Sequence, residues 1–192
     1  MHTIAIVYFS GFGHTHLMAQ SIAAGAKQLT NTIAKLIRIT GEQIIEGRWH
    51  DDTILMTLNE ADAIIFGSPT YMGGVAGEFK AFLDGASQVW LQQGWKDKLA
   101  GGFTHSGSPA GDNQSTLLYL AINAAQHGMI WVSSGELPMQ SNGVNRLGSS
   151  LGAIGQTTPD FTQEASLDSG DRLTAHHYGH RIATAAHRWH NR

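Results

Sequence analysis

The chain has 192 residues, of which 42% are hydrophobic and 14% are charged, so it has a globular composition and enough length for one domain with a sizeable core. Its formal net charge of −3 supplies neither the basic field that nucleic-acid binding needs nor the strongly acidic field that steers a small electron carrier to its partners. The absence of cysteine excludes disulfides, thiolate catalysis and cysteine-ligated metal centres.

The apolar run at residues 4–9 is shorter than the hydrophobic region of a secretory signal, and no cationic segment precedes it. Nowhere do eighteen apolar residues follow one another. We therefore expect a cytoplasmic protein without membrane insertion, folded as a single domain over residues 1–192.

Five short segments rich in β-branched and aromatic residues predict strands. In chain order they cover residues 3–9, 32–39, 62–67, 99–105 and 129–132. Lys35 and Arg38 in the second segment indicate an edge position. Apolar residues at helical spacing predict helices over residues 17–29, from about 77 to 89, around 117–124 and over 171–189. Residues 133–168 show no clear period and predict a long loop.

Strands that alternate with helices at this length predict a parallel sheet covered by helices on both faces, which is a three-layer α/β sandwich. The flavodoxin-like strand order 2-1-3-4-5 is the natural candidate, with ligands at the carboxyl ends of the strands. Three glycine-rich loops should meet there, because they follow strands one, three and four. These loops are residues 10–15, 68–77 and 106–111.

The first loop, within SGFGHTH, is neither a Walker A motif nor a dinucleotide fingerprint. It lacks the Gly-Lys-Ser/Thr ending, and His16 stands where the fingerprint needs its third glycine. Residues 38–40 lack the acidic residue that would bind a ribose. The hydroxyls of Ser10 and Thr15, the loop N–H groups and the positive end of the next helix would suffice for a phosphate dianion. An ordinary capped turn is the alternative interpretation of this loop.

Four segments, in order along the chain, resemble one known family. GSPTYMGGVAGEFKAFLD at residues 67–84 resembles the Gly-Ser/Thr-Pro-Thr-x-x-Gly segment of the WrbA-type NAD(P)H:quinone oxidoreductases, which are flavodoxin-like FMN proteins. YFSGFGH, FTHSGSPAGDNQST and HGMIWV match the phosphate loop, the third loop and the His-Gly-Met segment of that family. The resemblance covers most of the chain and implies the same fold, with FMN as the cofactor.

Position by position, the resemblance also implies the residues that hold FMN. The phosphate would lie against Ser10, Gly11, Phe12, Gly13, His14 and Thr15. The isoalloxazine ring would be framed by Pro69, Thr70, Tyr71, Met72 and Gly73, together with Ser106, Gly107, Ser108, Pro109, Ala110 and Gly111.

The resemblance implies three further roles. His127 would lie at the edge of the flavin, where it would bind the cofactor and serve as the catalytic residue. Phe12 and Trp90 would contact the substrates, with Trp90 as a wall over the exposed face of the flavin. Packing in the core is the alternative interpretation of Trp90.

The implied activity is that of an FMN-dependent NAD(P)H:quinone oxidoreductase. NADH or NADPH would give a hydride to the flavin, which would then pass two electrons to a quinone at the same face, in ping-pong order. A homodimer or homotetramer is also implied. A flavodoxin-type electron carrier and an FMN-binding module without turnover are the alternatives.

The chain departs from the family pattern in four places, one of which is the segment between Ile39 and Asp62, shorter than in the longer family members. The family often has arginine where Tyr71 stands and glutamate where Asn113 stands. Residues 134–168 also diverge. The choice between NADH and NADPH and the identity of the quinone therefore stay open.

The last predicted helix is rich in histidine, with His176, His177, His180, His187 and His190. The spacing of His176 and His180 is one that metal ligands use. A solvated helix face explains these residues as well, and we expect no metal site. For the His-x-His pair at His14 and His16, metal binding is likewise the minor interpretation.

Overall fold

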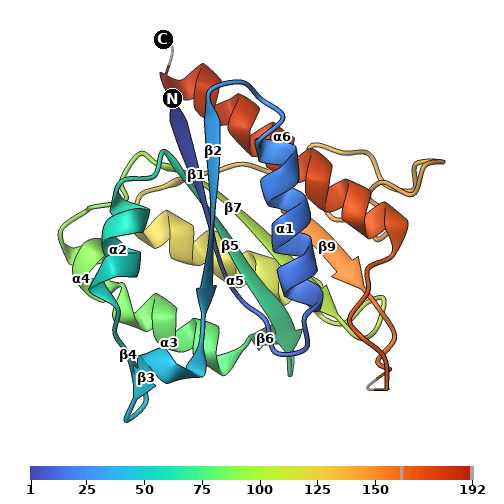
Figure 1. Ribbon diagram of the computed structural model, residues 1–192, viewed down its shortest axis with the longest axis horizontal. Helices are drawn as coiled ribbons and strands as arrows, with labels where there is room; N and C mark the ends of the chain where they lie inside the picture. The colour runs from blue at the N-terminus through green and yellow to red at the C-terminus, as the bar shows by residue number, and fades with distance from the viewer. Residues whose placement is uncertain (161, 191–192) are drawn as a thin grey trace.

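The computed structural model describes residues 1–160 and 162–190, and Figure 1 shows their arrangement. The main sheet has the order β2-β1-β5-β7-β8, and each neighbouring pair along this path is parallel. Its strands are β1 (His2–Phe9), β2 (Thr32–Ile39), β5 (Ala63–Tyr71), β7 (Leu99–Ser106) and β8 (Ile130–Trp131). This order confirms the flavodoxin-like arrangement, with β2 at the edge.

Helices cover both faces of the sheet (Figure 1). On one face lie α1 (His14–Ala26) and α6 (Ser169–His190); on the other lie α2 (Asp52–Asn59), α3 (Gly77–Gly85), α4 (Ser87–Leu91) and α5 (Asn113–Gln126). Alternate side chains of β1 enter the two cores, Ile6 beneath α1 and α6 and Val7 beneath α3 and α5. None of these helices, within the part of the chain that the structure describes, is long and apolar enough to cross a membrane.

The helices α1 and α6 cross at very short range, which two glycines permit. A Cβ atom added at Gly25 would collide with the carbonyl of His176, and one added at Gly179 would collide with the carbonyl of Ile22. The last helix is thereby fixed against the first, and both ends of the described chain lie at the same end of the molecule (Figure 1).

Two separate strands share the fifth position of the sheet. The short β8 pairs with Leu99 and Ala100 at the start of β7. The strand β9 (Ala153–Gln156) pairs with residues 103–106 at the end of β7. The strand expected at residues 129–132 is therefore shorter, and a second strand lies inside the expected loop. Its signal was weak because Ile154 is its only β-branched residue.

The third predicted strand runs past its expected end because it continues into a hairpin. Met72 and Gly73 have φ angles of 47° and 79°, as in the tight turns that join hairpin strands. The strand β6 (Gly74–Val75) then pairs antiparallel with β5. The helix expected from about 77 to 89 is divided into α3 and α4.

Residues 41–59 contain elements that the sequence pattern did not predict. A 3-10 helix (Gly41–Gln43) leads into a small antiparallel hairpin of β3 (Ile44–Ile45) and β4 (Arg48–Trp49). Asp51 then caps α2, because its side chain accepts a hydrogen bond from the N–H of Ile54 at 3.0 Å.

Candidate cofactor site

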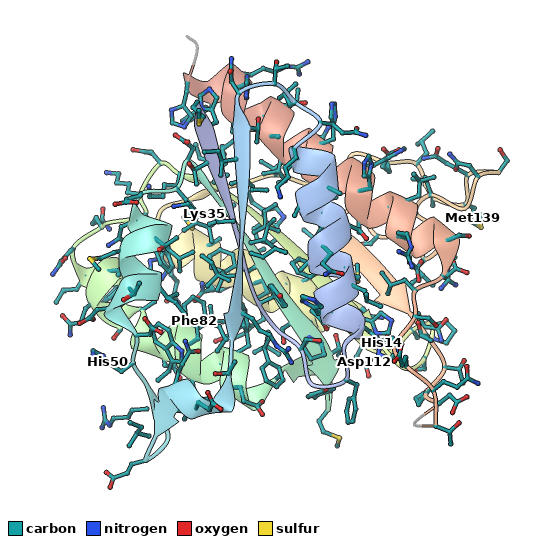
Figure 2. All side chains as sticks on the ribbon, in the orientation of Figure 1. His14, Lys35, His50, Phe82, Asp112 and Met139 are labelled. Carbon is teal, nitrogen blue, oxygen red and sulfur yellow. The ribbon has the colours of Figure 1, made fainter. Side chains whose placement is uncertain are left out.

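A cavity of about 450 Å³ lies at the carboxyl ends of β1, β5 and β7, a size typical of small-molecule sites. The loops after these three strands supply most of its wall, and a segment after β9 supplies the rest. The lining residues are Gly11, Phe12, His14, Thr15, Pro69, Thr70, Tyr71, His105, Ser106, Gly107, Thr157, Pro159, Asp160, Gln163 and Ala165. Figure 2 shows His14, from the first loop, and Asp112, directly after the third loop, at this lower end of the molecule.

The first loop brings the positive end of α1 to the cavity. Gly13 precedes the helix with a φ of 93°, a conformation that favours glycine, and it has no side chain to cap the N–H groups of the first turn. The next two residues, His14 and Thr15, line the cavity. A Cβ atom on Gly13 would lie 2.8 Å from Cβ of Ala165, so the loop passes close to the segment after β9. The cavity is thereby suited to an anion.

Ser10 is buried and holds the first loop in place. Its Oγ accepts a hydrogen bond from the N–H of His16 at 3.2 Å, and its carbonyl accepts one from Nη2 of Arg38 at 2.8 Å. Ser10 is outside the lining of the cavity. In this structure Ser10 therefore shapes the loop.

Thr70 joins the second loop to the third. Its Oγ1 lies 2.8 Å from the hydroxyl oxygens of Thr104 and Thr116, and 3.2 Å from Oδ1 of Asn113. The amide of Asn113 in turn donates to Oγ of Ser106 at 2.8 Å. Asn113, at a position where the family often has glutamate, is thus a neutral member of a network that fixes β5, β7 and α5 relative to one another.

Two histidines stack against each other at the cavity. The ring centroids of His14 and His105 are 4.6 Å apart, with 13° between the ring planes, and Nε2 of His105 lies 3.1 Å from Oγ1 of Thr157. Burial, reinforced by His14 and Arg146, lowers the pKa of His105 to about 3, and burial also lowers the pKa of His14. Both rings are therefore neutral at physiological pH. The sequence pattern placed His105 at the end of a strand and did not assign it to the site.

Phe12 and Tyr71 form an aromatic pair at the cavity. Their ring centroids are 6.4 Å apart at an angle of 72°, an edge-to-face arrangement. Both rings keep accessible surface: Phe12 is 63% exposed and Tyr71 is 38% exposed. Burial, with a contribution from Glu78, raises the pKa of Tyr71, so its phenol is protonated at neutral pH.

The structure brings nine of the predicted cofactor residues to the lining: Gly11, Phe12, His14, Thr15, Pro69, Thr70, Tyr71, Ser106 and Gly107. The other predicted residues of the three loops lie outside it: Ser10, Gly13, Met72, Gly73, Ser108, Pro109, Ala110 and Gly111. The third loop is closed on itself, because the hydroxyl of Ser106 donates to the carbonyl of Ser108 at 2.8 Å.

His127 and Trp90 do not reach the cavity within one chain. The 14 residues of α5, about 21 Å at 1.5 Å per residue, separate His127 from the end of the helix beside Ser106. The buried His127 instead packs on Trp95, with ring centroids 4.4 Å apart, and burial lowers its pKa to about 4. Trp90, on α4, is 46% exposed and outside the lining. The cavity of a single chain therefore does not include His127, and its place at the flavin edge stays a prediction.

The wall formed by Thr157, Pro159, Asp160, Gln163 and Ala165 was not predicted from the sequence. Arg146 and Asp171 organise it, with Nη2 and Oδ2 2.7 Å apart, and the same carboxylate accepts a hydrogen bond from the N–H of Gln156 at 2.8 Å. This contact fixes the end of β9. Pro159 then lies against the third loop, since a Cβ atom on Gly107 would be 2.9 Å from its ring. Partners this far apart in the chain leave no periodic signal in the sequence.

Comparisons with known proteins find relatives over most of the chain. The model of the NADPH-dependent FMN reductase family matches residues 13–142, more than half of the chain. Flavodoxin FldP of Pseudomonas aeruginosa is 40% identical over 196 residues, which cover 99% of this chain and 100% of that protein. Quinone-oxidoreductase QR2 of Triphysaria versicolor is 36% identical over 141 residues, 69% of each chain.

Two further matches extend over nearly the whole chain. An NAD(P)H dehydrogenase (quinone) of Solidesulfovibrio magneticus is 31% identical over 201 residues, which cover 96% of this chain and 98% of that protein. The crystal structure of a WrbA-like flavodoxin from Agrobacterium tumefaciens superposes with a TM-score of 0.75 at 38% identity, covering 98% of this chain and 99% of that one. Sequence and fold together show that the chain belongs to the NADPH-dependent FMN reductase family, among its WrbA-type, flavodoxin-like members.

Proposed function

We propose that this protein holds FMN in the cavity described above and reduces quinones at the expense of NADH or NADPH. One observation carries the proposal: a single cavity has the amino-terminal end of α1 in its wall and an accessible aromatic pair beside it. The helix end suits a phosphate, and the aromatic rings suit a flat ring system. When bound, FMN would supply the chemistry that takes a hydride equivalent from the nicotinamide and delivers two electrons to the quinone.

The residues present fit the phosphate without a lysine or arginine in the lining. The N–H groups at the start of α1 and the hydroxyl of Thr15 are neutral donors, and the helix dipole adds a partial positive charge. Because Gly13 has no Cβ atom, the backbone can approach phosphate oxygens closely. His14 and His105 add neutral ring surface beside these donors.

The residues around the rest of the cavity fit the ring. Phe12 of the first loop and Tyr71 of the second offer aromatic surface, while the hydroxyl network of Thr70 fixes the second loop relative to the third. Such preorganisation lowers the entropic cost of binding a flat ligand. The accessible surface of Phe12 and Tyr71 also leaves room for a second flat molecule, as a nicotinamide or a quinone requires.

A ping-pong order follows if both substrates use the same face, and steady-state kinetics test it. The initial rate of quinone reduction would be measured against NADPH concentration at several fixed quinone concentrations. Parallel lines in double-reciprocal plots support the proposal. Intersecting lines contradict it, because they require both substrates to be bound at once.

An electron carrier is the second candidate, and the 40% identity to a protein named flavodoxin over the full length favours it. The net charge of −3 argues against the strongly acidic surface that would steer such a carrier. Purified protein loaded with FMN would be mixed with NADPH and a soluble quinone. Sustained turnover supports the reductase, whereas bound flavin without sustained turnover supports the carrier or a module that only binds FMN.

We also propose a homo-oligomer, either a dimer or a tetramer. Leu118 and Ile122 lie one turn apart on α5, and each is about half exposed. Trp90 and Leu91 on α4 are also exposed. Light scattering of the purified protein gives the assembly. A monomer with full turnover would contradict the proposal and would show that one chain is sufficient.

A further inference from the structure

A second group of chemically active side chains lies at the opposite end of the sheet from the cavity. Figure 1 shows the start of β1 beside the end of α6, and the stacked rings of His2 and His190 confirm the contact. His2, Asp62 and His190 each direct one ligand-type atom to a common region, and these atoms lie within 4.8 Å of one another. Three residues far apart in the sequence therefore converge.

The distances between these atoms are close to those around a tetrahedral metal ion. Nε2 of His190 lies 3.3 Å from Oδ1 of Asp62, and Nδ1 of His2 lies 3.9 Å from Oδ2 of the same carboxylate. Zinc bonds of about 2.0–2.1 Å in tetrahedral geometry hold ligand atoms about 3.3 Å apart. The His190–Asp62 pair already has this separation, while the His2–Asp62 pair is wider and the two histidine atoms lie within 4.8 Å of each other, so His2 must move closer when an ion binds.

The ring of His2 has a buried atom whose bonding capacity is unused. Its Nδ1 is buried and has no hydrogen-bond partner among the residues that the structure describes. At 3.9 Å the carboxylate of Asp62 is too distant to accept a hydrogen bond. A buried polar atom without a partner is costly, and a metal ion that takes its lone pair removes that cost.

Neighbouring residues already orient two of the three side chains. The ring of His187 packs on His2 with centroids 4.3 Å apart, and Nε2 of His187 lies 3.1 Å from Oγ1 of Thr32. Oδ2 of Asp62 accepts a hydrogen bond from the N–H of Thr3 at 2.7 Å. Outer contacts of this kind hold metal ligands in position.

We propose that His2, Asp62 and His190 bind a divalent transition-metal ion, for which Zn²⁺ is the natural probe, and that the ion joins the start of β1 to the end of α6. Two imidazoles and one carboxylate are ligand types of such ions, and water completes the coordination. None of the three residues lines the cofactor cavity, so the role is structural. The pattern of the last helix alone could not reveal this site, because two of its three ligands come from other elements.

Zinc binding to the full-length, FMN-loaded and chelator-treated protein tests the proposal. Isothermal titration calorimetry should give one Zn²⁺ per chain, and the melting temperature should rise by about 5–10 °C when free Zn²⁺ is at 100 times its Kd. The double variant His2→Gln/His190→Gln should lose more affinity than the roughly 10- to 100-fold that follows loss of an outer-shell partner. Its circular dichroism and flavin content in chelator should match those of the wild type.

A matched control uses the other histidines of α6. The double variant His176→Gln/His180→Gln removes the pair with metal-like spacing but should keep both the stoichiometry and the affinity. Asp62→Asn is a milder test, because the amide oxygen can still accept the hydrogen bond from the N–H of Thr3 while the negative charge is lost. The zinc affinity of this variant should also fall. No zinc binding by the wild type below millimolar concentration overturns the proposal. So does unchanged binding by His2→Gln/His190→Gln, or loss of binding in the control variant.

Discussion

His105 and His127 lie near opposite ends of the sheet and are alike in burial, in ring contact and in the direction of their pKa shifts. Each is at most 5% exposed, and each has a pKa far below the ordinary histidine value, about 3 for His105 and about 4 for His127. Each ring also lies against another ring, His14 at 4.6 Å for the first and Trp95 at 4.4 Å for the second. Burial, ring contact and a lowered pKa therefore do not distinguish a binding residue from a packing residue.

Their positions on the sheet distinguish them. His105 lies at the carboxyl end of β7, lines the cavity and has a partner in Thr157. His127 follows α5 at the amino end of β8, and its Nδ1 has no partner among the described residues. Ligands of this fold bind at the carboxyl ends of the strands, so position places His105 at the proposed site and His127 away from it within one chain.

The largest expected effect comes from adding a side chain at Gly13, in the first loop beside the cavity. In Gly13→Val a branched side chain must adopt a φ of 93°, with its Cβ 2.8 Å from Cβ of Ala165. We expect the Kd for FMN to rise by about 100-fold or more, equivalent to about 2.7 kcal/mol. The quenching of FMN fluorescence by added protein measures it.

Gly47→Val is the matched control for this change. Gly47 has a φ of 78° in the turn between β3 and β4, and an added Cβ would meet no atom within 4 Å. Similar backbone strain should lower stability by about 1–3 kcal/mol while FMN affinity is unchanged. Equal loss of FMN affinity in both variants would show that the first loop is not the site.

The second effect separates the two histidines directly. His127→Ala removes a buried ring from Trp95, so the free energy of unfolding should fall by about 2–3 kcal/mol, somewhat less than for loss of a larger aromatic ring. Turnover per bound FMN should stay at the wild-type level. His105→Ala should instead weaken FMN binding by about 10-fold. Urea unfolding, flavin content and steady-state rates measure these quantities. If His127→Ala keeps full stability but shows lower turnover per bound flavin, the expected catalytic role of His127 is supported.

The lowered pKa of His127 should make the free energy of unfolding depend on pH in mild acid. In the unfolded chain this ring takes up a proton near pH 6.5, but in the folded protein it stays neutral down to about pH 4. The unfolded state therefore binds more protons below pH 6.5, and stability falls by about 1.4 kcal/mol per pH unit through this group. Urea unfolding between pH 6 and 5 should show a pH slope lower by nearly one proton in His127→Gln, whereas the slope near pH 7.5 should be the same in both proteins. An unchanged slope would mean that the folded protein protonates this ring normally.

The smallest expected effect concerns the hydroxyl network between the loops. Thr70→Val removes an oxygen that lies within 3.2 Å of three partners, so stability should fall by about 1–2 kcal/mol and FMN affinity by severalfold. Thr57→Val is the control, because the hydroxyl of Thr57 is exposed and bonds only a carbonyl of its own helix. Its stability should change by less than about 0.5 kcal/mol. Similar losses of stability and FMN affinity in both variants would show that the hydroxyl network of Thr70 does not stabilise the site.

The sequence predicts β1, β2 and β7 and the three loops well because their signals are local. Residues 32–39 form β2 with no shift in its bounds, since β-branched residues define it and turns flank it. The three glycine-rich loops meet where a parallel sheet requires. The glycines of the first loop therefore predict, from the sequence alone, a loop whose backbone N–H groups can approach an anion closely.

The rest depends on contacts that no local pattern encodes. The strand β9 exists because it pairs with β7, and the wall it carries depends on Arg146 meeting Asp171. His105 looks like the last residue of a strand until its stack with His14 is seen. The His-Gly-Met motif matches His127 to a position in the family, but it does not give the distance of His127 from the cavity. The length of α5 determines that distance.

The relative affinity for FMN and riboflavin is the most direct test of the cavity. The two ligands share the ring and differ in the phosphate, so their ratio isolates the group that the end of α1 is proposed to hold. By fluorescence quenching at neutral pH, we predict that FMN binds at least about 100-fold more tightly, equivalent to about 2.7 kcal/mol. Equal affinities, or no binding of FMN, would contradict the assignment of this cavity.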